Sequence, residues 1–467
     1  DCLLSRGLGD VYKRQHLRYV GPDLTLRLNT NAPLSHVLAQ TAFVLPGELN
    51  FLLGSDETLQ TGIAETARDF EQKTTDYWRQ WTRRLALPLE WQDAVIRAAI
   101  TLKLSLYEDT GAIIAAMTTS IPEAPGSSRN WDYRYCWLRD AFFVVRALNS
   151  LSEVATMEDY LRWMSNVVID SQGGHIQPLF GIGLEKSLPE SFVDNLPGYR
   201  GMGPVRVGNQ AQEHFQHDVY GNVILGAAQA FHDHRLLHRA GAREFRALER
   251  VGEQAVRVFD QPDAGMWELR TRARIHTSSA IMSWAACDRL AKIAATLKLP
   301  DRADYWAGHA EGMRERILKE SWNEERQAFA ESFGGRDMDA SVLLMAEVGI
   351  VDPKDPRFIS TVDELERVLC DGPYMRRYEA PDDFGRPETA FNICAFWRID
   401  ALARIGRKKE ARAIFEAMLA VRNPLGLLSE DTHPVTGEMW GNFPQTYSMV
   451  GIINGAMRLS ARWDSVI

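Results

Sequence analysis

The sequence predicts a mainly α-helical protein whose larger part is an (α/α)6 barrel, preceded by the remnant of a β-sandwich. From Trp91 onward, apolar residues recur at helical spacing in about twelve segments. These segments are 91–108, 138–151, 156–170, 212–234, 242–259, 277–297, 302–321, 338–348, 359–370, 388–405, 407–421 and 444–463. Several short links between them suit helical hairpins. Helical spacing also fits a solenoid, but we find no sequence repeat that would favour one.

The first fifteen residues stand apart from the rest of the chain. Residues 1–15 show no helical or strand period that continues into residue 16 and beyond, and Asp10–Gln15 (DVYKRQ) resembles a translated library adaptor. We interpret residues 1–15 as a sequencing artefact and exclude them from the fold. On this interpretation the natural chain begins further upstream.

Strands and one helix are predicted before the barrel. In residues 16–56, Leu24–Leu28 alternates in polarity, and Ala42–Leu45 is a short apolar run followed by Pro and Gly. Because a few strands do not form a stable sheet alone, we interpret this segment as the remnant of a β-sandwich domain. Residues 57–88 are charged and mostly helical in spacing, so we predict a linker helix there, with the barrel over 89–467.

The composition excludes several classes of protein. At 45% hydrophobic and 25% charged residues, the 467-residue chain is an ordinary globular protein. A net charge of −9 without a long basic run argues against nucleic acid as a partner, and the apolar runs are too short for a membrane span. The five cysteines form no CxxC pair, so we expect reduced thiols, no metal site and no cofactor. The predicted compartment is the cytoplasm, and the oligomeric state is left open.

One stretch, Arg129–Leu148 (RNWDYRYCWLRDAFFVVRAL), combines aromatic and charged residues at a helix start. Apolar residues take helical spacing after Leu138, so Arg139 and Asp140 lie in the first helical turn. The preceding loop holds Trp131, Asp132, Tyr133, Arg134, Tyr135 and Trp137. Aromatic faces stack on the apolar faces of sugar rings, and charged side chains bond sugar hydroxyls. The pattern favours a sugar site, although a buried helix start with a structural ion pair would look similar.

Two glutamates lie in loops that precede predicted helices. Glu268 is in Gly265–Arg270 (GMWELR), and Glu430 is in Gly426–Gln445 (GLLSEDTHPVTGEMWGNFPQ). Either glutamate, seen alone, is most simply a solvated surface residue. The longest irregular stretch, Gly173–Asn209, is rich in Gly and Pro, and loops of that length usually serve a function.

These three motifs together resemble glycoside hydrolase family 15, the glucoamylase and bacterial trehalase family. NWDYRYCWLRDA is similar to its first signature, GMWELR to the segment of its general acid, and GLLSED to the segment of its general base. The motifs span most of Trp91–Ile467. The resemblance implies a barrel of the six-hairpin glycosidase type and an inverting hydrolase.

The resemblance also implies a role for individual residues. Glu268 would be the general acid and Glu430 the general base, and Trp267 would be an apolar neighbour that favours the protonated acid. Glu430 must stay ionised to take a proton from water. The positions implied to bind substrate or water are Tyr133 at the nucleophilic water, Trp137 at the glucosyl site, Arg139 and Asp140 at the distal hydroxyls of the terminal glucose, Arg377 at the sugars, Glu388 where a loop enters a helix, and Arg206 in the long loop.

The substrate remains open at this point. Asn222, Thr271 and His433 stand where relatives commonly carry Glu, Gly and Asp, which leaves the leaving-group subsite in doubt. We expect an exo-acting α-glucosidase that releases glucose from α-glucans or malto-oligosaccharides, with an α,α-trehalase as the alternative. A non-catalytic glucan-binding protein would need neither glutamate, and a phosphorylase would need a phosphate pocket in place of Glu430. The histidines 175, 214 and 217 lack the spacing of metal ligands.

Overall fold

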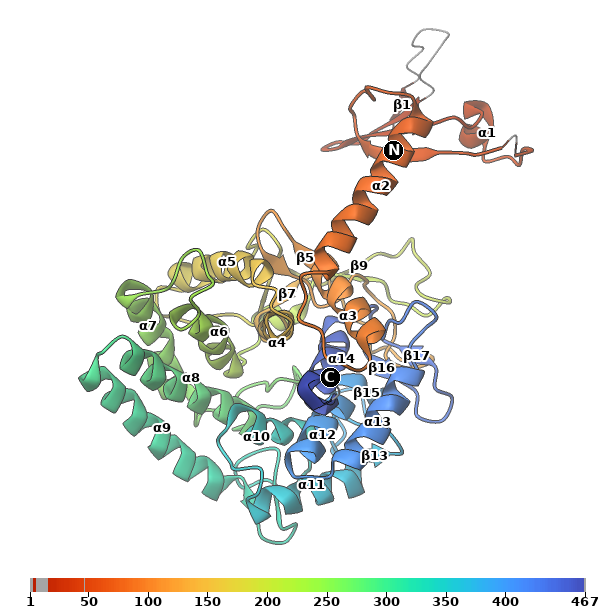
Figure 1. Ribbon diagram of the computed structural model, residues 1–467. Coiled ribbons are helices and arrows are strands. Elements are labelled where there is room, and N and C mark those ends of the chain that lie inside the picture. The colour runs from red at the N-terminus through yellow and green to blue at the C-terminus, as the bar shows by residue number, and fades with distance from the viewer. Residues whose placement is uncertain (1–2, 6–15, 46, 466–467) are drawn as a thin grey trace. The chain divides into compact units, whose positions relative to one another are not determined.

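The computed structural model describes residues 3–5, 16–45 and 47–465. The chain forms two compact units, Asp1–Arg84 and Leu85–Ile467, which are described separately (Figure 1).

The described part of the first unit is built on one antiparallel sheet. Its strands, in sheet order, are β1 (Leu3–Ser5), β2 (His16–Val20), β3 (Thr25–Thr30) and β4 (Phe51–Ser55), accompanied by the helices α1 (Leu34–Ala39) and α2 (Ile63–Thr82). Leu28 pairs with Leu17 on one side and with Leu53 on the other, so one face of the sheet carries a leucine row. Leu17 is buried, whereas Leu53 is 62% exposed.

The structure differs from three predictions for this unit. Leu3–Ser5 pairs with β2 as a strand that the sequence pattern does not predict, and the rest of residues 1–15 lies outside the described residues. The strand predicted at Ala42–Leu45 is wrong, because that run has no strand pairing and Val44 is 89% exposed. The linker helix is present but shorter than predicted, over Ile63–Thr82.

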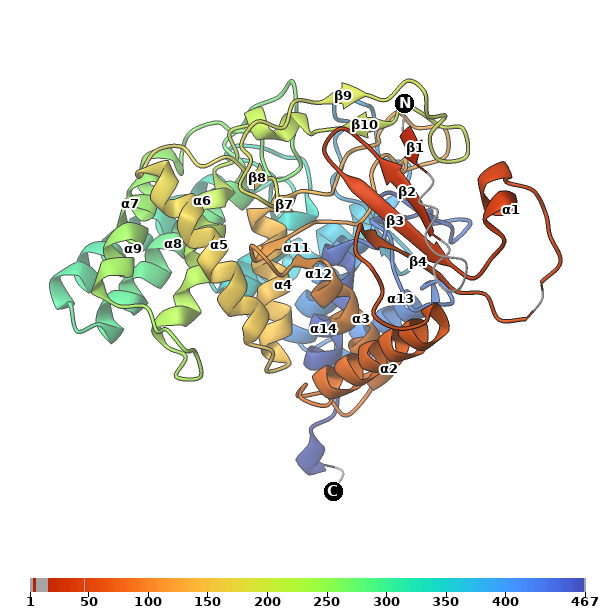
Figure 2. The same ribbon diagram turned by 90° about the horizontal axis from the view of Figure 1, so that it is seen from above.

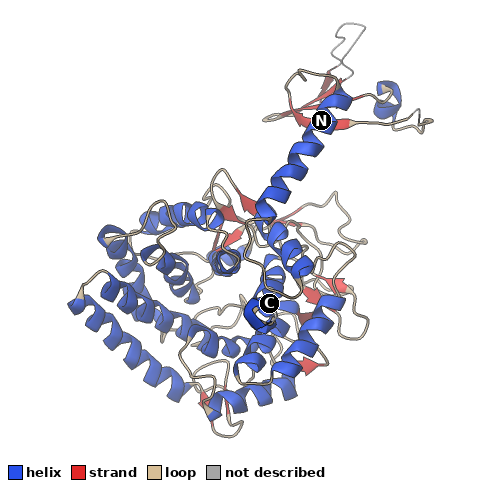
Figure 3. Cartoon of the chain, in the orientation of Figure 1, coloured by secondary structure: helices blue, strands red, loops and turns tan. Residues whose placement is uncertain are grey.

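Within the described residues, the second unit contains twelve α-helices. They are α3 (Gln92–Leu104), α4 (Leu138–Ser150), α5 (Ala155–Ser171), α6 (Asp218–Ala228), α7 (Ala242–Val258), α8 (Thr277–Thr296), α9 (Pro300–Glu320), α10 (Leu344–Val348), α11 (Pro356–Leu369), α12 (Asn392–Arg404), α13 (Lys408–Ala420) and α14 (Thr446–Leu459). Helices are the predominant regular secondary structure of this unit, and its strands are short (Figure 3). The predicted helices 212–234 and 338–348 are shorter in the structure, and each is extended by a 3-10 turn.

The helices alternate between an outer and an inner ring. The inner helices α4, α6, α8, α10, α12 and α14 contact one another in that order, and α14 closes the ring against α4 (Figures 1 and 2). An inner helix such as α8 is buried over most of its surface, whereas the outer helix α7 buries one stripe that includes Phe245, Leu248 and Val251. Closure of the ring distinguishes the barrel from a solenoid, and the predicted (α/α)6 fold is confirmed.

The connections before the inner helices carry short strands that fix the site loops. β7 (Cys136–Trp137) leads directly into α4 and pairs with β8 (Leu179–Phe180) in the long loop. β15 (Ala390–Phe391) leads into α12 and pairs with β16 (Asp431–Thr432), which pairs with β17 (Met439–Trp440). These pairings bring the N-terminal ends of α4, α12 and α14 to the same end of the barrel.

The described residues contain neither a membrane-spanning helix nor a metal-binding cluster. No helix among them has the length and apolarity that crossing a membrane requires. No cluster of three or more His, Cys, Asp or Glu residues has a geometry that could hold a metal ion within residues 3–5, 16–45 and 47–465. Cys136, Cys287, Cys370 and Cys394 are free thiols.

Candidate active site

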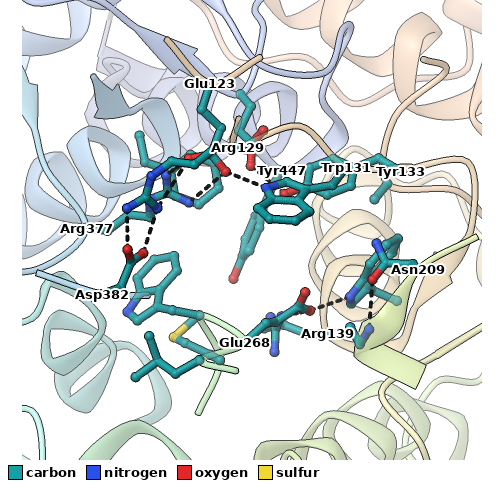
Figure 4. A pocket seen from close by; sticks show the side chains of 18 of the residues that line it. Glu123, Arg129, Trp131, Tyr133, Arg139, Asn209, Glu268, Arg377, Asp382 and Tyr447 are labelled. Carbon is teal, nitrogen blue, oxygen red and sulfur yellow. Dashed lines mark hydrogen bonds and ion pairs between the residues drawn. The ribbon is translucent and has the colours of Figure 1, made fainter. Parts of the chain in front are cut away.

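One pocket at the N-terminal ends of the inner helices gathers most of the residues predicted from the motifs (Figure 4). Its lining includes both glutamates and six of the predicted substrate-binding residues: Tyr133, Trp137, Arg139, Asp140, Trp267, Glu268, Arg377 and Glu430. Residues more than a hundred positions apart therefore share one cavity.

Glu430 lies on the buried side of this pocket, directly before β16. It is 1% exposed, and its Oε1 accepts a 2.7 Å hydrogen bond from the Tyr133 hydroxyl. Burial, together with the carboxylates of Glu123 and Asp431, raises the pKa of Glu430 well above its usual value. Glu430 is thus a deeply buried carboxyl group whose protonation depends on the acidic groups beside it.

Glu268 lies in a strained turn. Its φ of 62° is in the left-handed region of backbone conformation, which residues other than glycine and asparagine rarely adopt. The turn is closed by the Glu268 N–H, which donates to the Gly265 oxygen at 3.2 Å. A Cβ on Gly265 would stand 2.8 Å from the His276 ring, so only glycine fits between this turn and the start of α8. Strain of this kind is typical of functional sites.

Two donors hold the Glu268 carboxylate on the pocket side. The Trp137 indole N–H donates to Oε1 at 2.7 Å, and an Arg139 guanidinium nitrogen lies 3.6 Å from the same oxygen. The Glu268 side chain is 24% exposed, so it borders the open side of the cavity. Trp267 was expected as its apolar neighbour, but its own N–H donates to Asp339 at 2.7 Å. The tryptophan that contacts Glu268 is therefore Trp137, through a polar contact.

Arg139 and Asp140 occupy the first turn of α4. A guanidinium nitrogen of Arg139 donates to Asp218 at 2.9 Å and to Gln216 at 3.0 Å. These two bonds fix the Arg139 side chain. Burial raises the pKa of Asp140 to about 6, although the nearby Arg139 acts in the opposite direction. This pair presents a fixed cation and a carboxyl group to the pocket, which suits adjacent sugar hydroxyls.

The opposite wall is a network of charges. Arg377 donates to Glu123, and Arg129 donates to Asp382 and to the main-chain oxygen of Gly385. The guanidinium of Arg377 also lies 5.2 Å from the centre of a phenylalanine ring in β15. Both arginines are buried, so the network is rigid and presents its polar atoms in fixed directions.

Comparison with known proteins identifies the family. The pattern described as Glycosyl hydrolases family 15 matches residues 90–457. The chain belongs to glycoside hydrolase family 15. The family resemblance of its motifs is confirmed.

Curated relatives of this family 15 chain are trehalases. A trehalase of Mycolicibacterium smegmatis is 34% identical over 451 residues, covering 93% of this chain and 66% of the relative. Trehalases of Mycobacterium tuberculosis and Thermoplasma volcanium are 34% and 32% identical, covering 85% and 83% of this chain but 58% and 62% of their own lengths. The chain thus spans about three fifths of the length of these relatives.

A solved structure confirms the fold. A bacterial glucoamylase complexed with acarbose superimposes with a TM-score of 0.71 at 14% identity, covering 96% of this chain and 73% of that chain. At that identity the likeness concerns the fold alone. It extends over both units of the chain and includes the helical barrel.

Two predicted residues lie outside the pocket of this family 15 chain. Glu388 is exposed, and the buried side chain at this loop is its neighbour Thr389. Arg206 is buried behind the wall, where it pairs with Glu190 and stacks 5.1 Å from the centre of the Trp131 ring. Glu388 faces solvent because the chain becomes buried one residue later, at Thr389, whose hydroxyl bonds the main-chain oxygen of Glu123 just before β15. Arg206 supports an aromatic side chain of the pocket and does not line it.

Several pocket residues were not among the predicted site residues. They are Glu123, Arg129, Trp131, Asn209, His214, Arg270, Asp382, Asp383, Phe384 and Tyr447. Trp131 was within the recognised motif but had no assigned role, and its ring centre lies 5.1 Å from the Arg206 guanidinium and 4.7 Å from that of Arg270. The acidic run at Asp382 and Asp383 carries no motif, so only the folded chain brings it to the pocket.

Proposed function

We propose that this family 15 enzyme is an α,α-trehalase that acts with inversion of configuration. The pairing of Glu268 and Glu430 in one pocket, with Arg139 and Asp140 beside them, is the observation that carries the proposal. Six trehalases, 27% to 34% identical over 80% or more of the chain, favour trehalose over longer α-glucans as the substrate. This reverses the order of the two substrates expected from the motifs.

The terminal glucose would be held by the first turn of α4. Arg139 donates and Asp140 accepts, so the pair fits two neighbouring hydroxyls of one ring. Asp218 and Gln216 keep Arg139 in place before substrate enters, which lowers the entropy lost on binding. The aromatic rings of Tyr133 and Trp137, 5.4 Å apart, would contact the apolar face of the same sugar.

The two glutamates would divide the proton transfers. Glu268 gives its proton to the oxygen that bridges the two glucoses, and its partly exposed position allows it to regain a proton from solvent. Glu430 takes a proton from the water that attacks the anomeric carbon, and the Tyr133 hydroxyl orients the Glu430 carboxylate. The attacked glucose leaves as the β-anomer, and the other glucose leaves as the α-anomer.

The test is a panel of trehalose, maltose, maltotriose and soluble starch, with the anomers of glucose followed by NMR during the reaction. We expect the highest kcat/KM on trehalose, with equal initial amounts of α- and β-glucose. Two equivalents of α-glucose would indicate retention and contradict the assigned roles. Preference for maltotriose or starch would support a glucoamylase instead, and absence of turnover on every sugar would support a binding protein.

A phosphorylase is the least compatible alternative. The carboxylates of Glu430 and the nearby Glu123 would repel an incoming phosphate. Product analysis with and without inorganic phosphate checks this point, because a phosphorylase would yield glucose 1-phosphate.

A further inference from the structure

Glu430 has a second buried carboxyl group as its direct neighbour. Asp431 is 0% exposed, and its strand lies between β15 and β17. A Cβ on Gly441 would stand 2.7 Å from Glu430 Oε2 and 3.3 Å from Asp431 Oδ2, so both oxygens border the space that this glycine leaves open. Neither oxygen has a hydrogen-bond partner among the described residues. We call these two groups the carboxyl pair.

No cation contacts the carboxyl pair directly. In the described part of the chain, the ion pairs of this wall join Arg377 to Glu123 and Arg129 to Asp382, and none includes a member of the carboxyl pair. Two adjacent buried carboxylates without a counter-ion are unfavourable, so such a pair holds a proton and titrates as a unit. Burial raises the pKa of both members well above the usual values, and the nearby Glu123 carboxylate acts in the same direction, whereas the Arg377 guanidinium acts in the opposite direction on both.

The hydrogen bonds indicate where this proton lies. Thr389 Oγ1 lies 2.9 Å from the main-chain oxygen of Glu123 and 3.2 Å from Asp431 Oδ1. A hydroxyl has one hydrogen and a carbonyl oxygen only accepts, so Thr389 donates to Glu123. The contact between Thr389 Oγ1 and Asp431 Oδ1 is then a hydrogen bond if Oδ1 carries the hydrogen and donates it to Oγ1. Glu430 Oε1, in contrast, accepts from the Tyr133 hydroxyl at 2.7 Å, which favours its charged form.

We propose that Asp431 holds the proton of the carboxyl pair and leaves Glu430 ionised, which makes Asp431 a positioning residue for the base. The neutral Asp431 removes the like charge that would otherwise drive a proton onto Glu430. The inference rests on the proposed function only for the role of Glu430 as base. The location of the proton does not depend on which sugar is the substrate.

Infrared difference spectroscopy of the substrate-free enzyme tests the proton directly, because a protonated carboxyl group has its own C=O stretching band. The spectra are taken at about pH 8, above the pKa of about 6 to which burial raises both Asp140 and Asp339. We expect a protonated-carboxyl band in the wild type that Asp431→Asn removes. Asp170→Asn, at a position 63% exposed, is the control and leaves the band unchanged.

Glu430→Gln gives a second infrared outcome. Removal of the neighbouring charge lowers the pKa of Asp431, so the band should disappear at a pH lower by about one unit or more than in the wild type. A band that persists in Asp431→Asn and is lost in Glu430→Gln would place the proton on Glu430 and overturn the proposal. A wild-type spectrum without the band would overturn it as well.

Kinetics separate a positioning role from a structural one. Asp431→Ala should lower kcat by about 10- to 100-fold, and Asp431→Asn should recover most of this loss, because its amide donates to Thr389 without a charge. The acid limb of the kcat/KM profile should stay at the same pH in Asp431→Asn. An acid limb about one unit lower would mean that Asp431 is ionised in the wild type, contrary to the proposal. If trehalose proves not to be the substrate, the infrared results still decide where the proton lies.

Discussion

The indole N–H of Trp137 donates to Oε1 of Glu268 across 2.7 Å. This bond links the last residue before α4 to a turn 131 positions further along the chain. It joins the start of α4, which we propose binds the terminal glucose, to the proposed acid through one rigid aromatic side chain.

Trp137→Phe tests this link. The substitution keeps an aromatic ring but removes the donor, and a hydrogen bond to a neutral group is worth about 0.5–1.5 kcal/mol. We expect kcat/KM to fall by about two- to tenfold, with little change in melting temperature. Trp463→Phe, at a position 48% exposed, is the control and should leave kcat/KM unchanged. Wild-type kinetics in Trp137→Phe would show that Glu268 is positioned by other contacts.

Glu268→Gln and Glu430→Gln test the division of roles. Each should lower kcat by about 10²–10⁴-fold, since each removes one proton transfer. An α-glucosyl substrate with a good leaving group, such as α-glucosyl fluoride, needs little protonation and should restore much of the activity in Glu268→Gln only. Equal rescue of both variants, or rescue of Glu430→Gln alone, would reverse or refute the assignment.

Asp218→Asn tests the support of Arg139. The amide keeps the shape of Asp218 but weakens its ion pair with Arg139, which lies at 2.9 Å. We expect KM for trehalose to rise by about tenfold and inhibition by free glucose to weaken in parallel. Unchanged glucose inhibition, measured by a competition assay, would mean that Gln216 and Asp140 hold Arg139 without help.

Asp140→Asn tests the clamp itself. Asp140 lines the pocket beside Arg139, and its carboxyl group would accept from a hydroxyl of the terminal glucose. We expect a higher KM, a lower kcat or both, with inversion preserved because neither glutamate is altered. Wild-type steady-state constants would remove Asp140 from the sugar site.

The stability of the protein should depend on Asp339 in a defined pH window. Burial raises the pKa of Asp339 from 3.8 to about 6, so the folded state binds its proton more tightly than the unfolded chain does. The stabilisation is complete at pH values below the unfolded pKa and is lost as the pH rises through the folded pKa. Relative to Asp339→Asn, the wild-type free energy of unfolding should fall by ~2 kcal/mol between about pH 4 and pH 7. Urea unfolding of both proteins across that range measures it, and parallel pH profiles would contradict it.

Sequence reasoning found the helices and most of the predicted site because both leave local patterns. Helical spacing and the switch from alternation near Glu57 predict the two kinds of secondary structure, and the motif around Arg139 marks a helix start. Glu268 and Glu430 stand in distinctive loops, which the family resemblance makes recognisable. The strand predicted at Ala42–Leu45 failed for the same local reason, since a short apolar run does not reveal whether a partner strand lies beside it.

By itself, the sequence determined the helical barrel and the family, and it singled out the two glutamates that line the pocket. Only the tertiary structure decided which side chains share the pocket and in what electrostatic state. Glu388 and Arg206 fall outside it, while Glu123 and Asp382 enter it through contacts more than 250 positions apart in the chain. Burial is a property of the folded chain, so the raised pKa of Glu430 and its pairing with Asp431 arise where distant segments remove both carboxyl groups from water.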